Sequence, residues 1–276
     1  MSLTSLLDEN RDVRDFLRAA FKKPKVSQKP PLLVPAKTRN YGLVGTAFDY
    51  LVRLTTKRMN PTAYERGHWV AESAIPRLPS RLRKAARATT KSARQEASQF
   101  LASGTRTDAL LSSLLCLAQL DTVFRTGRFA QLVGQPADPD DVADLEELAE
   151  QMPESGLAAK QMCVLNPTFG EASRAVGGAD ADLVLDETLY EIKTTVEPPV
   201  AQEHFHQLVG YYLLYRIGGL DGVRGQPSIN RVGFYYSRQA QFFSWGIEDV
   251  VGSTPLLEAV TWFARRIGLD HVAAAV

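Results

Sequence analysis

Cysteine is scarce in this chain of 276 residues, which has only Cys116 and Cys163, far apart in apolar segments. This scarcity argues against a disulfide framework and against a thiolate metal site, and a reducing cytoplasm is the expected location. Long hydrophobic runs are also missing, so no segment approaches the length of a membrane span and no membrane partner is expected. The first 21 residues mix acidic and basic side chains, which is not the pattern of a signal peptide.

The sequence also lacks internal repeats, low-complexity tracts and the phosphate-binding motif Gly-x-x-x-x-Gly-Lys-[Ser/Thr]. Without that motif no nucleotide-driven motor is expected in the chain, and any ATP-dependent helicase would be a separate partner. An apolar content of 45% is ordinary for a globular protein. The length suffices for one large domain or for a core with a sizeable insertion.

The chain has no large excess of positive or negative charge, since its formal net charge is +1. The charges are nevertheless unevenly distributed along the sequence. Residues 1–100 carry 20 Lys and Arg against 8 Asp and Glu, whereas residues 101–200 carry 6 against 17. This asymmetry predicts a basic surface for a polyanion beside an acidic centre. The alternative is that the two blocks pair with each other in the fold.

The hydrophobic pattern divides the chain into an N-terminal segment, 1–40, and an α/β domain, 41–276, with a helical insertion over about 71–160. In the segment we expect one amphipathic helix with Ser5 as its N-cap, followed by an extended connector over 22–37. In the domain we expect helices at 45–58, through most of 71–133 with a buried part at 110–124, at 202–217 and at 256–267. Strands are expected at 231–236 and 241–245, and the acidic stretch 136–154 is predicted to be a solvated loop leading into a short helix.

The most informative stretch is 177–195, which predicts a hairpin. Two apolar runs, 183–185 and 189–192, flank Asp186 and Glu187, which suit a tight turn. If the loop has two residues, the two strands pair in a register that places charged side chains of one strand opposite charged side chains of the other.

Four charged side chains lie on this hairpin, and we expect Asp182 to pair with Glu191 and Asp180 with Lys193. Because side chains alternate along a strand, all four then project from one face. Three carboxylates and one ammonium in so small a patch are costly to hold together. The arrangement makes sense if a divalent cation and a phosphate occupy it; the alternative is a pair of turn-capping acids beside a solvated strand face.

The chemistry of these groups fits phosphodiester hydrolysis. Asp182 and Glu191 supply hard oxygen ligands for Mg²⁺ or Mn²⁺, and the carbonyl of Ile192 can complete the set. Lys193 lies about 7 Å along the strand from Glu191, within reach of an attacking water or of developing charge. Downstream, Gln207 and Tyr211 share one face of a helix with His204. The alternative is that this face packs Tyr211 into the core.

In order, an Asp-Leu-Val strand, a Glu-x-Lys strand after a short turn and a Gln-x-x-x-Tyr helix resemble the PD-(D/E)XK nuclease superfamily, above all its RecB-like and lambda-exonuclease-like branch. The match covers about 177–215, with compatible strands to 245, whereas 60–160 match no family that we can name. The resemblance implies a restriction-endonuclease-like α/β/α core with a mixed sheet. It also implies a Mg²⁺-dependent deoxyribonuclease that leaves 5′-phosphate ends. The cluster-binding cysteines of some members are absent, so no iron–sulfur site is expected.

By position, the resemblance makes Asp182 the metal aspartate, because Leu183-Val184 follow it, although Asp180 satisfies the Gly-x-x-Asp form and is an alternative. It makes Glu191 the second metal ligand and Lys193 the catalytic lysine.

The resemblance further implies that Gln207 and Tyr211 orient that lysine or the substrate backbone. Members of the branch usually add an acidic residue or a histidine from an upstream helix, for which Asp49 has the best spacing and Glu72 and Glu171 are competitors.

Nucleic acid is the expected partner. In a basic stretch over 77–94, four side chains are predicted to hold the phosphate backbone: Arg83, Lys84, Arg87 and Lys91. The stretch could also be a solvated helix without acids. A catalytically inactive binding or regulatory subunit and an RNA-cleaving enzyme are the alternative functions. The sequence leaves open endonuclease or exonuclease action, duplex or single-stranded DNA, and homo-oligomerisation.

Overall fold

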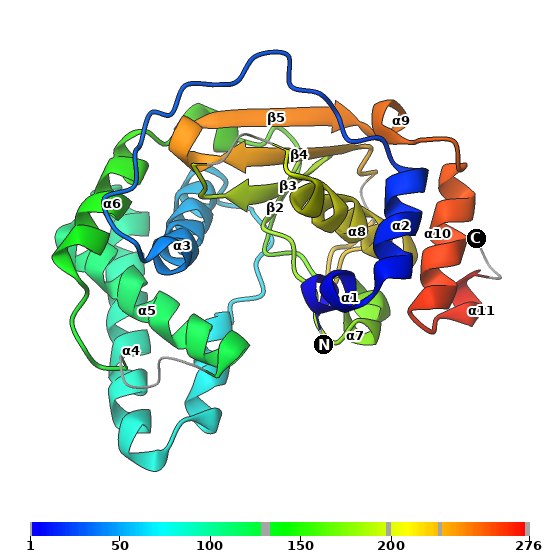
Figure 1. Ribbon diagram of the computed structural model, residues 1–276. Helices are drawn as coiled ribbons and strands as arrows, with labels where there is room; N and C mark the ends of the chain where they lie inside the picture. Colours follow the sequence, from blue (N-terminus) through cyan, green and yellow to red (C-terminus); the bar gives the residue numbers. More distant parts are fainter. Residues whose placement is uncertain (1, 128–132, 197–199, 226–227, 274–276) are drawn as a thin grey trace.

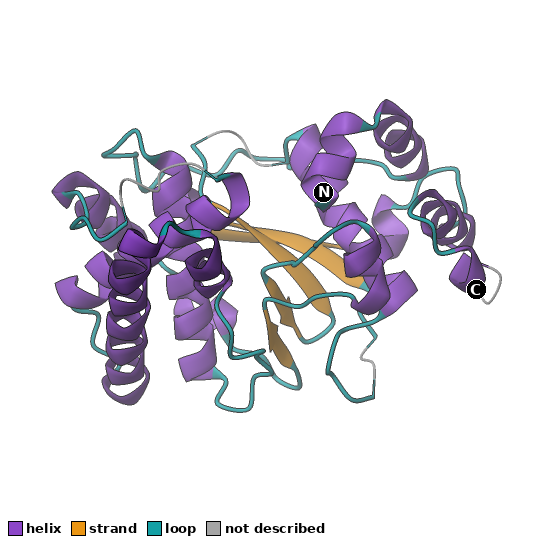
Figure 2. Ribbon diagram, turned by 90° about the horizontal axis from the view of Figure 1, so that it is seen from below, coloured by secondary structure: helices purple, strands orange, loops and turns teal. Residues whose placement is uncertain are grey.

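A mixed β-sheet lies between two groups of helices in the computed structural model (Figures 1 and 2). The structure describes residues 2–127, 133–196, 200–225 and 228–273. The sheet has five strands in the order β1 to β5: Cys163–Leu165, Leu183–Leu185, Thr188–Lys193, Arg231–Tyr236 and Gln241–Gly246. Neighbours are antiparallel except β3 and β4, which are parallel because the chain returns between them through a long helix, α8.

One face of the sheet is covered by helices from both ends of the chain, by a short helix between β1 and β2, and by α8. They are α1 (Leu3–Glu9), α2 (Arg11–Ala20), α7 (Gly170–Ala175), α8 (Gln202–Gly218) and α10 (Leu256–Arg266). Their apolar side chains form a core with Val184, Leu189 and Phe234 of the sheet. The remaining short helices are α9 (Ile247–Val250), α11 (Asp270–Ala273) and the 3₁₀ helix η4 (Ser237–Gln239).

The opposite face is covered by the helical elements that precede β1. They are α3 (Tyr41–Met59), η1 (Val70–Arg77), α4 (Ser80–Ser103), α5 (Asp108–Thr126), α6 (Pro139–Glu150) and η3 (Glu154–Leu157). They form a second core with the alternate residues of the strands, among them Leu183, Leu185 and Tyr235. The side-chain period of two along each strand therefore divides the sheet between two cores.

The predicted α/β class is confirmed, and so is the mixed sheet. The predicted helices at 45–58, 110–124, 202–217 and 256–267 and both predicted strands agree with the structure to within four residues at each end. Of the helical stretch predicted over 71–133, residues 128–132 lie outside the described residues. The connector over 22–37 has no regular secondary structure, as predicted.

Two local predictions were wrong. The N-terminal helix is broken at Asn10 into α1 and α2, and Ser2 rather than Ser5 is its N-cap, because the Ser2 hydroxyl accepts the Ser5 N–H. The acidic stretch does lead through a short loop into a helix, α6, but it is less solvated than predicted, since α6 begins at Pro139 and buries Asp141 and Asp144. Their partners are distant in the sequence: the Arg238 guanidinium donates to Asp144 and the Asn40 amide donates to Asp141.

In the part of the chain that the structure describes, no helix combines the length and apolar character needed to cross a bilayer.

Candidate active site

The predicted hairpin is present and its register is the expected one. Leu183 pairs with Tyr190 and Leu185 with Thr188, which leaves a two-residue turn. Asp186 has a φ of 53° in that turn, and its carboxylate accepts three backbone N–H groups of residues 160–162. Asparagine and aspartate tolerate this left-handed conformation better than most residues.

The four charged side chains are not all arranged as predicted. Asp182 lies one position beyond the ladder and accepts the Ile192 N–H at 2.6 Å, so it stays on the open end of the hairpin. The predicted pairing of Asp180 with Lys193 is wrong, because the backbone of Asp180 bridges to Thr168 instead. The chain has already turned away from β3 at that point.

Acidic side chains from three directions converge on a cavity of about 440 Å³ beside the hairpin. Asp180, Asp182 and Glu191 come from the hairpin, whereas α3 supplies Asp49 and α5 supplies Asp121. Arg125, Gln207 and Tyr211 line the same cavity.

Of the three upstream acids, the structure brings only Asp49 to this cavity. Glu72 binds Arg94 and His68, and Glu171 contacts His271, so both competitors lie elsewhere.

Lys193 is held by two acceptors. Its Nζ lies 3.0 Å from Glu191 Oε1 and 2.8 Å from Gln207 Oε1, and Gln207 Nε2 donates to the Tyr211 hydroxyl at 3.0 Å. The lysine side chain is only 15% exposed. The helix motif and the strand motif therefore meet in one hydrogen-bonded chain, which fixes the ammonium at the edge of the acidic cavity.

Burial raises the pKa of three carboxyl groups of the cavity, those of Asp182, Glu191 and Asp49. Burial raises the pKa of Asp182 well above its ordinary value, and the charges of Glu191 and Asp49 raise it further. Burial also raises the pKa of Glu191 and of Asp49, although Lys193 and Arg53 respectively oppose the shift. Mutual repulsion of buried acids is typical of functional sites and is relieved by a cation.

Two carboxylate oxygens of the cavity lack partners. Among the residues that the structure describes, Asp49 Oδ1 and Glu191 Oε2 are buried and accept no hydrogen bond. Within that part of the chain, no group of three or more Asp, Glu, His or Cys side chains is placed to hold a metal ion. Mg²⁺ does not need such a group, since it is commonly held by one or two carboxylates together with water and substrate phosphate. The oxygen donors of this cavity therefore fit such an ion.

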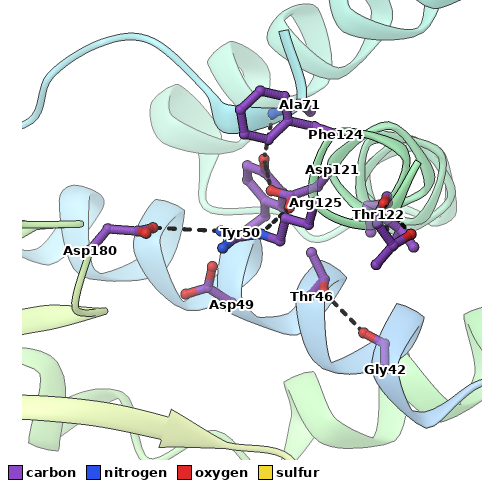
Figure 3. Close-up of polar contacts among 12 residues, drawn as sticks. Gly42, Thr46, Asp49, Tyr50, Ala71, Asp121, Thr122, Phe124, Arg125 and Asp180 are labelled. Atoms are coloured by element: carbon purple, nitrogen blue, oxygen red, sulfur yellow. Dashed lines mark hydrogen bonds and ion pairs between the residues drawn. The ribbon is translucent and has the colours of Figure 1, made fainter. Parts of the chain in front are cut away.

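A second polar network, which the sequence did not predict, borders the cavity on α3 and α5 (Figure 3). Asp121 is 1% exposed, accepts the Tyr50 hydroxyl at 2.9 Å and binds Arg125 Nε at 2.5 Å. Arg125 also lies 3.5 Å from Asp180, so it joins α5 to the segment before β2. The signal was available: Asp121 is the one charged residue in the apolar run 110–124, and Arg125 follows at helical spacing.

The remaining predicted residues lie outside the cavity. His204 is not among its lining residues, and burial together with the Lys193 charge lowers its pKa to about 4, so it is neutral at pH 7. The four cations of the predicted backbone-binding face, Arg83, Lys84, Arg87 and Lys91, are exposed along α4.

The uneven charge of the sequence is not explained by pairing of its two blocks. Within the described parts of the chain, Lys37 with Glu147 is the ion pair that joins residues 1–100 to 101–200, whereas Arg53 and Arg94 bind acids of their own block.

Comparisons with protein-family models, with curated proteins and with solved structures found no match for this chain.

Proposed function

We propose that this protein is a metal-dependent nuclease of the PD-(D/E)XK type, with a restriction-endonuclease-like core, that hydrolyses DNA phosphodiester bonds and leaves 5′-phosphate ends. One observation carries the proposal. Glu191 and Asp182 line one cavity together with Gln207, and the Lys193 ammonium lies beside it between Glu191 and Gln207, at 3.0 and 2.8 Å. Carboxylates for a cation and a fixed positive charge beside them are the parts that phosphodiester hydrolysis requires.

Asp182 and Glu191 would hold Mg²⁺ or Mn²⁺, with Asp49 and Asp180 as further oxygen donors of the same cavity. When bound, the ion polarises the phosphoryl group and lowers the pKa of a coordinated water. The buried Asp49 Oδ1 and Glu191 Oε2, which lack partners within the described residues, are the atoms that gain most from a cation.

In the reaction a water oxygen attacks phosphorus, the bond to the 3′ oxygen breaks, and that oxygen leaves with a proton as a 3′-hydroxyl group. Lys193 donates hydrogen bonds to the phosphoryl oxygens as their charge grows. Gln207 and Tyr211 limit the motion of the lysine, so little reorganisation is needed when the charge develops.

The cations of α4 receive a different role. Because Arg83, Lys84, Arg87 and Lys91 lie on an exposed helix outside the acidic cavity, they attract the DNA backbone without reading its sequence. A cytoplasmic location and a separate helicase subunit agree with this function and with the scarcity of cysteine and the missing nucleotide motif.

The test uses linear duplex, closed circular duplex, single-stranded DNA and RNA, each with Mg²⁺, Mn²⁺ or EDTA. We expect cleavage of DNA that needs the metal. Glu191→Gln and Lys193→Met should each lower the rate on the order of 10³-fold. Glu187→Gln, in the exposed turn of the same hairpin, should leave the rate unchanged.

The product pattern separates the alternatives. Degradation of linear forms alone indicates an exonuclease, and nicked circles indicate an endonuclease. Cleavage of RNA alone, binding without cleavage, or full activity of both correctly folded variants would contradict the proposal.

A further inference from the structure

A second cavity, of about 790 Å³, adjoins the acidic one, and Asp180 lines both. Its walls mix polar and apolar groups and come mostly from three parts of the chain. Residues 66–73 supply Arg66, His68 and Ser73, α5 supplies Phe124, and the segment after β1 supplies Thr168 and Arg174. A polynucleotide extends beyond the phosphate that reacts, so the space beside Asp180 is where a neighbouring nucleotide of a bound strand would lie.

Phe124 gives this cavity an aromatic surface. The guanidinium of Arg77 lies 4.1 Å from the centre of the Phe124 ring, and Arg77 Nη1 donates to the Phe124 carbonyl at 3.3 Å. Arg77 therefore covers one face of the ring and limits its motion. A base entering from the cavity stacks on the ring, since every base has a π face and stacking on phenylalanine tolerates any sequence.

The charges of the cavity suit a phosphate. Each of its two carboxylates has an arginine partner, Asp180 with Arg125 at 3.5 Å and Asp221 with Arg66 at 3.0 Å. Arg174 is exposed and adds a further positive charge. Among the charged side chains that line the cavity, Arg66 and Arg174 balance Asp180 and Asp221, so the wall lacks the negative excess of the acidic cavity next to it.

We propose that this second cavity is a nucleotide subsite, in which an unpaired base stacks on Phe124 and the adjoining phosphate meets Arg174. The inference rests on the proposed nuclease function and adds a substrate class, a strand that is unpaired next to the scissile bond. A paired base cannot stack on a side chain of the protein without leaving its own duplex.

The test combines a protein variant with an altered substrate. Labelled single-stranded oligodeoxynucleotides carry one abasic residue at successive positions from the cleaved bond, and kcat/KM is measured with Mn²⁺. For the wild type, one position next to the bond should lower kcat/KM about tenfold through lost stacking. Phe124→Leu should lower kcat/KM on the intact strand to a similar degree and show no further loss at that abasic position. Phe124→Trp, which keeps an aromatic face, should retain both the rate and the abasic effect.

Matched arginines test the phosphate contact. Arg174→Ala should raise KM several-fold and leave kcat unchanged, whereas Arg265→Ala, exposed at the end of α10, should change neither. A flat abasic profile with an active wild type, or an abasic effect that persists in full in Phe124→Leu, would overturn the subsite and leave the nuclease standing. No cleavage of any substrate by the wild type would overturn both.

Discussion

Two of the places where the described residues bury charge satisfy it differently. Arg238 and Asp144, both 0% exposed, meet through two hydrogen bonds of 2.9 and 2.8 Å, and Arg238 also donates to the Val34 carbonyl. In the acidic cavity, by contrast, buried carboxylate oxygens of Asp49 and Glu191 accept no hydrogen bond from any described residue.

This difference distinguishes buried charges that stabilise the fold from buried charges that serve the site. The guanidinium at Arg238 faces both carboxylate oxygens of Asp144, so this pair ties the connector, α6 and the β4–β5 corner together. Acids that repel one another and keep unpaired oxygens cost stability, which a fold tolerates where a ligand compensates for them. The three predictions below test this contrast.

The largest effect is expected at the paired charges. Asp144→Ala leaves the Arg238 guanidinium buried without its partner, which should lower the free energy of unfolding by about 3–5 kcal/mol. Chemical denaturation measures the loss. The double variant Asp144→Leu/Arg238→Met should recover much of it, because neither charge then remains buried. A single variant within about 0.5 kcal/mol of the wild type would contradict a structural role for the pair.

Asp182→Asn should raise the free energy of unfolding, in contrast to Asp144→Ala. Burial and the charges of Glu191 and Asp49 raise the pKa of Asp182, so the folded state holds its proton more tightly than the unfolded state. Stability contributed by that proton is present below the unfolded pKa of about 3.9 and is lost as pH rises through the folded pKa. At neutral pH in EDTA, removal of the charge should therefore raise the free energy of unfolding by about 1 kcal/mol.

Thermal melts over a range of pH check the sign. The gain from Asp182→Asn should shrink as pH falls, because the wild-type carboxyl group then becomes protonated. Mg²⁺ should raise the melting temperature of the wild type and not that of the variant. A variant that is less stable than the wild type in EDTA at neutral pH would show that Asp182 serves the fold.

The parts of the site that lie close together in the sequence were predictable. The hairpin register, the Glu191–Lys193 strand and the Gln207–Tyr211 face follow from local periods of two and of about four residues. Their convergence was inferred from a family pattern, and the contact between Lys193 and Gln207 spans only one loop.

The contacts that join distant segments were not predictable from local pattern. Asp144 meets Arg238 across 94 positions, and each residue taken alone is typical of a solvated surface. The Arg125–Asp180 ion pair was not predicted for the same reason, since it joins α5 to the distant segment before β2. Asp180 was assigned to the wrong pairing because the alternating pattern of a strand continues in the sequence beyond the point where the chain turns away from β3.

Asp186 provides the smallest test and a third kind of carboxylate, one that is partly exposed and satisfied by the backbone. Burial alone would raise its pKa, but hydrogen bonds from the N–H groups of residues 160–162 hold it below the ordinary value. Asp186→Asn keeps the left-handed turn and weakens these bonds, so it should lower the free energy of unfolding by about 0.5–1.5 kcal/mol at pH 7. Because the folded pKa is depressed, this stabilisation is present above the unfolded pKa and is lost as pH falls through the folded one.

The loss of stability caused by Asp186→Asn should therefore shrink as pH falls, and the gain from Asp182→Asn should shrink too. The free energies of unfolding of the two variants should thus approach the wild-type value from below and from above, respectively. Denaturation at neutral and acidic pH measures the free energy of unfolding of both variants. A change of the same sign in the two would contradict the distinction between acids that stabilise the fold through their partners and acids that serve the site.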